Sequence, residues 1–186
     1  DVCSSDLSFS DSINSAQLTI VGASYTSQSF HFASGANGSG TSVFDPPPDD
    51  PSPIAGGATL SVQAGDTVSG TIVGDSASNV VLGTALDTTL SGGLQIVSSG
   101  GVASGTQVLS GGSEYVSAGG IASEAVVGSS GSEVVDSGGV LTDATLLGGT
   151  LTVFAGGVAG GTIAFAGDGL MKLADADSFS GTVAGL

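Results

Sequence analysis

The sequence predicts an all-β protein whose central part is a parallel β-solenoid, a right-handed β-helix of coils about 19 residues long. Three observations predict this fold. Similar segments follow one another in tandem, Gly-Gly pairs recur at a constant phase within them, and Val or Ile recurs at fixed positions around the pairs. A disordered Gly/Ser linker would share the composition, but it would keep neither the period nor the apolar positions.

Four tandem repeats carry the pattern most clearly. They read SGGLQIVSSGGVASGTQVL (91–109), SGGSEYVSAGGIASEAVVG (110–128), SSGSEVVDSGGVLTDATL (129–146) and LGGTLTVFAGGVAGGTIAF (147–165). An earlier segment, 56–74, fits the same frame, and a shorter and degraded one, 75–90, follows it. Stacked coils of this kind bury their apolar positions as ladders that run along the solenoid.

Each repeat is expected to form a strand, a glycine turn, a second strand and another turn, because short Val/Ile/Thr-rich runs lie between glycines. The expected turn glycines are Gly100, Gly101, Gly119, Gly120, Gly138, Gly139, Gly156 and Gly157. The expected core ladders are Val62, Val97, Val116, Val135 and Val153 before the glycine pair, and Val102, Ile121, Val140 and Val158 after it.

The flanks predict further divisions of the chain. Residues 1–7, DVCSSDL, look like the translation of a sequencing adapter and contain the only cysteine, Cys3. We expect 8–44 to end an upstream β-rich module and the Pro/Asp-rich stretch 45–54 to be a linker. We expect the repeats to fill 55–165, and 166–186 to be a terminal coil or the start of another module. The whole reads as a segment of a longer protein.

Charge excludes some partners. The chain has 17 acidic residues, one lysine and no arginine, which gives a formal net charge of −16. Nucleic-acid binding needs a basic surface that this composition does not provide. No run of 18 apolar residues is present, so we expect no direct insertion of this segment into a membrane.

Residues suited to catalysis are few. His31 is the only histidine, so it has no second histidine or nearby cysteine with which to form a metal site or a triad. Glu114 and Glu133 lie 19 residues apart and are expected to stack. Such a pair could bind a cation or have one raised pKa, but a solvated ladder is the favoured interpretation. We expect no catalytic residue, no metal and no cofactor.

The repeat pattern xGGxxxVxxGGxAxxTxV resembles the strand-loop-strand repeat of autotransporter passengers of the AIDA (adhesin involved in diffuse adherence) type. The resemblance covers about 56–165 and implies a β-helix displayed on the surface of a Gram-negative bacterium. It also implies that a glycosyltransferase can O-glycosylate serines in the short turns. The matching positions here are Ser98, Ser99, Ser117 and Ser137, whereas Phe154 and Ala155 replace them in the last repeat.

The leading hypothesis is therefore a non-enzymatic, surface-displayed segment that acts in adhesion, autoaggregation or biofilm formation. Its expected partners are a second copy of itself or ligands on host or bacterial cells. The alternative is a repeat spacer in a large secreted protein that carries a Hint domain or a glycan-processing domain elsewhere.

Overall fold

The computed structural model describes residues 4–10, 15–21, 31–34, 41–44, 53–54 and 56–185. Before residue 53 only the backbone is described. Cys3 and most of the expected linker 45–54 lie outside the described residues, as does the side chain of His31. The chain divides into two compact units, residues 1–30 and 31–186.

Two antiparallel strand pairs precede the repeats in sequence. The first pairs β1 (Ser4–Ser10) with β2 (Ser15–Val21), and the second pairs β3 (His31–Ser34) with β4 (Thr41–Phe44). In each pair the two strands follow one another closely in sequence, which antiparallel pairing permits.

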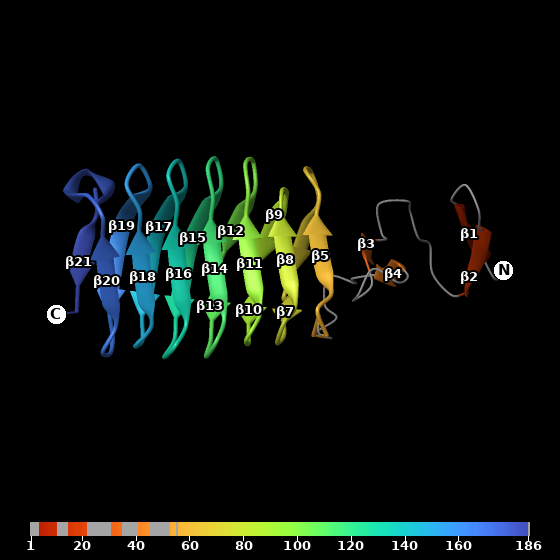
Figure 1. Ribbon diagram of the computed structural model, residues 1–186, viewed down its shortest axis with the longest axis horizontal. Helices are drawn as coiled ribbons and strands as arrows, with labels where there is room; N and C mark the ends of the chain where they lie inside the picture. Colours follow the sequence, from red (N-terminus) through yellow and green to blue (C-terminus); the bar gives the residue numbers. More distant parts are fainter. Residues whose placement is uncertain are drawn as a thin grey trace. The chain divides into compact units, whose positions relative to one another are not determined.

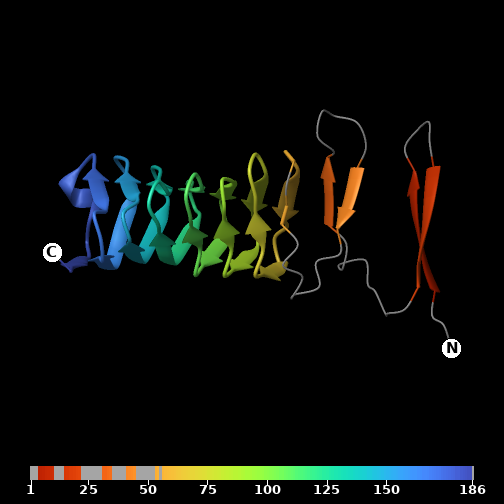
Figure 2. The ribbon, with the colours of Figure 1, turned by 90° about the horizontal axis from the view of Figure 1, so that it is seen from below.

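From residue 56 onward the chain forms the predicted parallel β-solenoid, and the fold class is confirmed. The first sheet has seven parallel strands, one for each coil, and Figures 1 and 2 show the coils stacked side by side in a right-handed winding. Its strands are β5 (Thr59–Val62), β8 (Ser78–Val81), β11 (Leu94–Val97), β14 (Ser113–Val116), β16 (Ser132–Val135), β18 (Thr150–Val153) and β20 (Leu170–Leu173).

The second sheet returns the chain on the other side of each coil and is also parallel. Its strands are β6 (Thr67–Ser69), β7 (Ile72–Val73), β9 (Thr84–Leu86), β10 (Thr89–Leu90), β12 (Val102–Ser104), β13 (Gln107–Val108), β15 (Ile121–Val127), β17 (Val140–Leu146), β19 (Val158–Phe165) and β21 (Thr182–Ala184). The 3-10 helix η2 (Ala176–Ser178) precedes β21. Within the described residues, no helix is long and apolar enough to cross a bilayer.

The two glycines of each pair serve different purposes. Gly119 has φ +77°, the left-handed conformation that glycine adopts without strain. Gly120 has no such φ, but a Cβ built on it would lie 2.3 Å from the carbonyl oxygen of Val97 in the preceding coil. The first glycine therefore makes the turn, and the second lets adjacent coils approach. The other three expected pairs repeat this arrangement: Gly100 and Gly101, Gly138 and Gly139, and Gly156 and Gly157.

The core is aliphatic and narrow. The first expected ladder is fully buried, with 0 % exposure at Val62, Val97, Val116, Val135 and Val153. A further ladder buries Val73, Val108, Val127 and Leu146 to the same extent. Burial of these columns from water in every coil is the main stabilising contribution to such a stack.

The second expected ladder does not face the core. Ile121 is 45 % exposed and Val158 is 37 % exposed, and Val102 and Val140 are only half-buried. The reason is the alternation of strand residues. The second glycine of each pair is buried, so the residue after it points outward and the next one points inward. The buried residues of this strand are Ala103, Ala122, Leu141 and Ala159.

Candidate functional site

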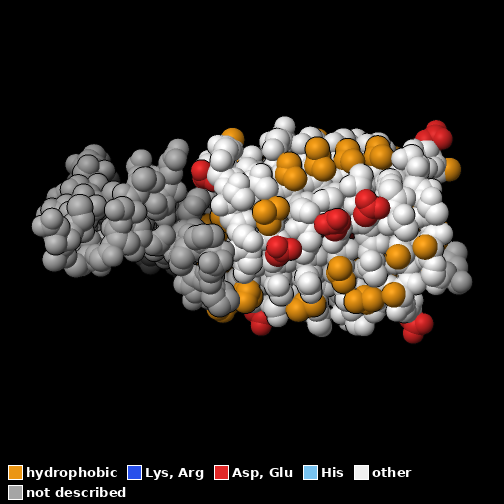
Figure 3. Space-filling model, turned by 180° about the vertical axis from the view of Figure 1, so that it is seen from behind, with side chains coloured by type: hydrophobic (Ala, Val, Ile, Leu, Met, Phe, Trp, Pro, Cys, Tyr) orange, Lys and Arg blue, Asp and Glu red, His pale blue; other side chains and the backbone are white. Residues whose placement is uncertain are grey.

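The residues that follow the glycine pairs form an apolar stripe on the outside of the second sheet. Val102, Ile121, Val140 and Val158 are paired in register across β12, β15, β17 and β19. We call these four residues the outer apolar ladder. Figure 3 shows a row of hydrophobic side chains along this face of the solenoid. A contiguous exposed apolar row is a common mark of an interaction surface.

Acidic residues lie at the next corner of the coil, within β15 and β17 and directly after β9. Asp87, Glu124 and Asp143 are exposed and have φ values of 52°, 56° and 57°. Aspartate adopts this left-handed conformation more readily than most residues. Asp143 also accepts a hydrogen bond from the backbone N–H of Thr162 at 2.7 Å. We call these three residues the acidic column, and Figure 3 shows acidic side chains on this face.

The candidate glycan acceptors lie in the turns that lead from the first sheet to the second. Ser99 and Ser137 are exposed, whereas Ser98 and Ser117 are half-buried. In the repeat that lacks these serines, Phe154 is 48 % exposed. The turns thus present two serines directly to solvent.

Glu114 and Glu133 do not form the solvated ladder that the sequence favoured. Both are fully buried, because they face the same side of their strands as the core residues Val116 and Val135 two positions later. The two-residue spacing of each glutamate from a core valine is present in the sequence, and it is the signal that predicts burial. Burial raises the pKa of both carboxyls, and the neighbouring Glu114 raises that of Glu133 further.

The two glutamates continue a polar row inside the solenoid. Asn79, Gln95, Glu114 and Glu133 are successive partners in register across β8, β11, β14 and β16. The Nδ2 of Asn79 donates to the Oε1 of Gln95 at 2.9 Å, and the Nε2 of Gln95 donates to the Oε1 of Glu114 at 2.8 Å. Fully buried groups of this kind are out of reach of a substrate.

A shallow depression of about 370 Å³ lies on the first sheet, where β8, β11 and β14 begin. Leu94, Tyr115 and the glycines and serines of three neighbouring turns line it. At this place only three residues, 91–93, separate β10 from β11, whereas four residues form the corresponding turn in each adjacent coil. Its lining contains no carboxylate, histidine or cysteine.

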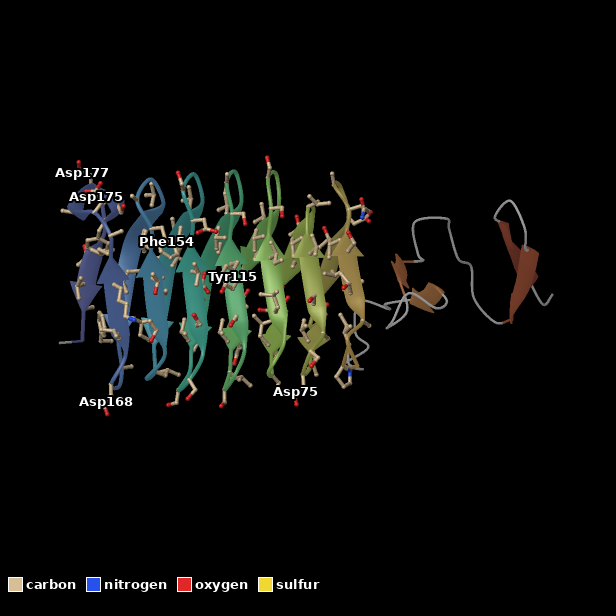
Figure 4. All side chains as sticks on the ribbon, viewed as in Figure 1. Asp75, Tyr115, Phe154, Asp168, Asp175 and Asp177 are labelled. Carbon is tan, nitrogen blue, oxygen red and sulfur yellow. The ribbon has the colours of Figure 1, made fainter. Side chains whose placement is uncertain are left out.

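The exposed acidic residues are spread over separate edges. Figure 4 shows Asp75 and Asp168 at one edge of the solenoid, and Asp175 and Asp177 at the opposite edge. Within the described part of the chain, no three residues among His, Cys, Asp and Glu are grouped so that they could hold a metal ion.

Solved structures include chains similar to this one. A crystal structure of the TibC-catalysed, hyper-glycosylated fragment TibA55-350 is 24 % identical, with a TM-score of 0.37, over 68 % of this chain and 66 % of that fragment. No protein-family model and no curated protein matches the chain. A likeness at this level supports no argument about function.

Proposed function

We propose that the chain is a non-enzymatic segment of a bacterial surface adhesin, displayed on or outside a Gram-negative cell as a repetitive β-helical stalk. The repeat pattern and the solenoid fold support this proposal. Function then lies in faces that repeat along the stalk, so that many weak contacts add up to a strong one. Adhesion, autoaggregation and biofilm formation all require such contacts.

The outer apolar ladder carries the proposal. It places four aliphatic side chains in register on the outer face of the second sheet, where each is exposed or half-buried. A second copy of the chain can cover this row with its own ladder. Removal of aliphatic side chains from water contributes about 25 cal/mol per Å² of apolar area, and this gain must exceed the entropy cost of association.

The test is self-association of the purified chain carrying Ile121→Asp or Val140→Asp. Each change adds a charge within the proposed contact, where an unpaired carboxylate is costly to bury. We expect the dissociation constant, measured by analytical ultracentrifugation, to rise at least about tenfold, which corresponds to 1.4 kcal/mol. Ser129→Asp is the matched control, because it adds the same charge to an exposed turn outside the ladder.

Salt provides an independent check. The acidic columns of two associating copies repel each other, and screening shortens that repulsion from about 30 Å at 0.01 M salt to about 8 Å at 0.15 M. We expect stronger self-association at the higher salt concentration.

If all three aspartate variants associate as the unmodified chain does, the ladder is not a contact and the alternative function is favoured. In that alternative, the segment is a repeat spacer beside a Hint or glycan-processing domain.

We further propose that a glycosyltransferase modifies the turn serines Ser98, Ser99, Ser117 and Ser137. The exposure of Ser99 and Ser137 supports this proposal most directly. The test is the intact mass of the native protein from its own host, compared with that of a variant in which all four serines are alanine. An excess mass that the variant loses supports modification, and native protein without any excess contradicts it.

A further inference from the structure

Glu114 and Glu133 form a carboxyl pair in the interior of the solenoid. They are partners in register on adjacent parallel strands, β14 and β16, and both are fully buried. Strands in such a sheet lie about 4.8 Å apart, which brings the two carboxyls to neighbouring positions. The arrangement raises the question of how two acidic groups are accommodated in an aliphatic core.

Hydrogen-bond donors reach only one of the four carboxyl oxygens. The Oε1 of Glu114 accepts from the Nε2 of Gln95 at 2.8 Å and from the Oγ1 of Thr106 at 3.0 Å. The Oε2 of Glu114 and both oxygens of Glu133 accept no hydrogen bond from any other described residue, and the two carboxyls interact with each other. Unpartnered buried oxygens of an ionised carboxylate are strongly unfavourable.

The sequence explains this asymmetry. Thr106 precedes Glu114 by eight residues, and the residue eight before Glu133 is Ala125, which is also buried. Repeat 91–109 thus supplies a hydroxyl to the glutamate of the following coil, whereas repeat 110–128 supplies only a methyl group to the glutamate of the coil after it. Glu133 therefore lacks the donor that would favour its ionised form.

Among the residues whose side chains are described, no oppositely charged group lies beside the pair. The inward-facing residues of β15, β17 and β18 around it are aliphatic: Ala122, Ala125, Leu141, Ala144 and Leu151. The titratable side chains on the packed strands, Tyr115, Glu124 and Asp143, are all exposed on the outside. Asp136, in the turn after β16, is half-buried, and Lys172 is exposed on β20, two strands from Glu133.

Either a proton or a cation can relieve the repulsion between two such carboxylates. Calcium takes six to eight oxygen ligands, whereas the pair offers three unpartnered oxygens. A proton needs only one donor and one acceptor. The geometry therefore favours the proton.

We propose that Glu133 carries a proton at neutral pH and donates it to the Oε2 of Glu114, so that this buried pair makes the solenoid more stable in acid than at neutral pH. The inference is independent of the proposed adhesive function, because it concerns the interior alone.

The direction of the pH effect follows from the pKa of Glu133, which burial and the neighbouring carboxylate raise well above its ordinary value of 4.5. An acid whose pKa is higher in the folded state contributes its full stability below the unfolded pKa. That contribution is lost as the pH rises toward and through the folded pKa. Stability attributable to the pair thus decreases from about pH 4.5 upward.

The experiment compares thermal unfolding midpoints at pH 5 and pH 7.5 for the unmodified chain, Glu133→Gln and Glu124→Gln. The amide of the first variant can donate to Glu114 without a proton from solvent, so we expect its midpoint at pH 7.5 to exceed that of the unmodified chain by roughly 3 °C. We also expect a smaller difference between the two pH values. Glu124→Gln removes the same charge from the exposed acidic column and should leave the difference unchanged.

Ala125→Thr is the second variant. It supplies to Glu133 the hydroxyl that Thr106 supplies to Glu114, in a column that already contains threonine. We expect it to reduce the pH dependence as well. The proposal is overturned if Glu133→Gln and Ala125→Thr both retain the full pH dependence. It is also overturned if a chelator lowers the midpoint at pH 7.5 and calcium restores it, because the pair then binds a cation.

Discussion

At the scale of single residues, the two glycines of each pair are required for different reasons, one conformational and one steric. Gly119 has a left-handed backbone, whereas Gly120 lies against the carbonyl oxygen of Val97. The second requirement is steric and depends on the neighbouring coil. It therefore belongs to the folded stack and is absent from the unfolded chain.

Gly120→Ala tests this steric role, with Gly128→Ala as its control. A Cβ at Gly120 would lie 2.3 Å from backbone, but one at Gly128 would lie 3.4 Å from its nearest neighbour. Neither glycine has a positive φ. We expect the first change to cost about 1–3 kcal/mol of unfolding free energy because the coils must separate. The second should be neutral or stabilising by up to about 1 kcal/mol. Urea unfolding measures both, and equal effects would show that coil approach is not limiting.

At the scale of strands, the alternation of inward and outward residues decides what each valine contributes. Val135 on β16 is fully buried, and Val140, at the start of β17, is half-buried on the outside. The two residues lie five positions apart, on either side of a glycine turn. Whether a valine of the repeat is buried or exposed therefore depends on its distance in sequence from the glycine turn.

Val135→Ala and Val140→Ala test that assignment with the same chemical change. Loss of two buried methyl groups and the resulting cavity should cost about 2 kcal/mol at Val135. At Val140, which solvent already reaches, we expect about 0.5 kcal/mol or less. Urea unfolding of the monomer at low protein concentration keeps self-association from affecting the comparison. A larger loss at Val140 would mean that the outer apolar ladder is packed against the stack.

Much of this element structure could be predicted from the sequence. The tandem period and the glycine pairs were sufficient to predict the coil, because they reflect local turn chemistry and stacking. The outward phase of Ile121 was missed because it depends on the buried second glycine, whose contact is with another coil. The burial of Glu133 contradicts the expectation from its charge, although its two-residue spacing from the buried Val135 points to the same face of the strand.

At the scale of the whole molecule, each coil contacts mainly the coils before and after it, so coils are interchangeable in a way that residues of a globular core are not. Deletion of residues 110–128 removes one complete repeat of 19 residues. Leu109 then precedes Ser129, just as it precedes Ser110 in the unmodified chain. The shortened solenoid keeps the frame of its strands.

The same deletion removes the buried carboxyl pair without a substitution in the remaining coils. Gln95 and Thr106, which donate to Glu114 in the full stack, would then face Glu133, the next glutamate in register. A single carboxyl with two donors stays ionised more easily than two carboxyls that compete for one pair of donors.

We therefore expect the shortened chain to keep its β-sheet circular dichroism spectrum and to lose most of the pH dependence of its unfolding midpoint between pH 5 and pH 7.5. Deletion of residues 147–165, another repeat of 19 residues, is the control, because it shortens the solenoid equally and leaves the pair in place. If both deletions retain the same pH dependence, the effect comes from the overall negative charge. If the first deletion alone abolishes the β-sheet spectrum, coil 110–128 has a structural role that its neighbours cannot replace.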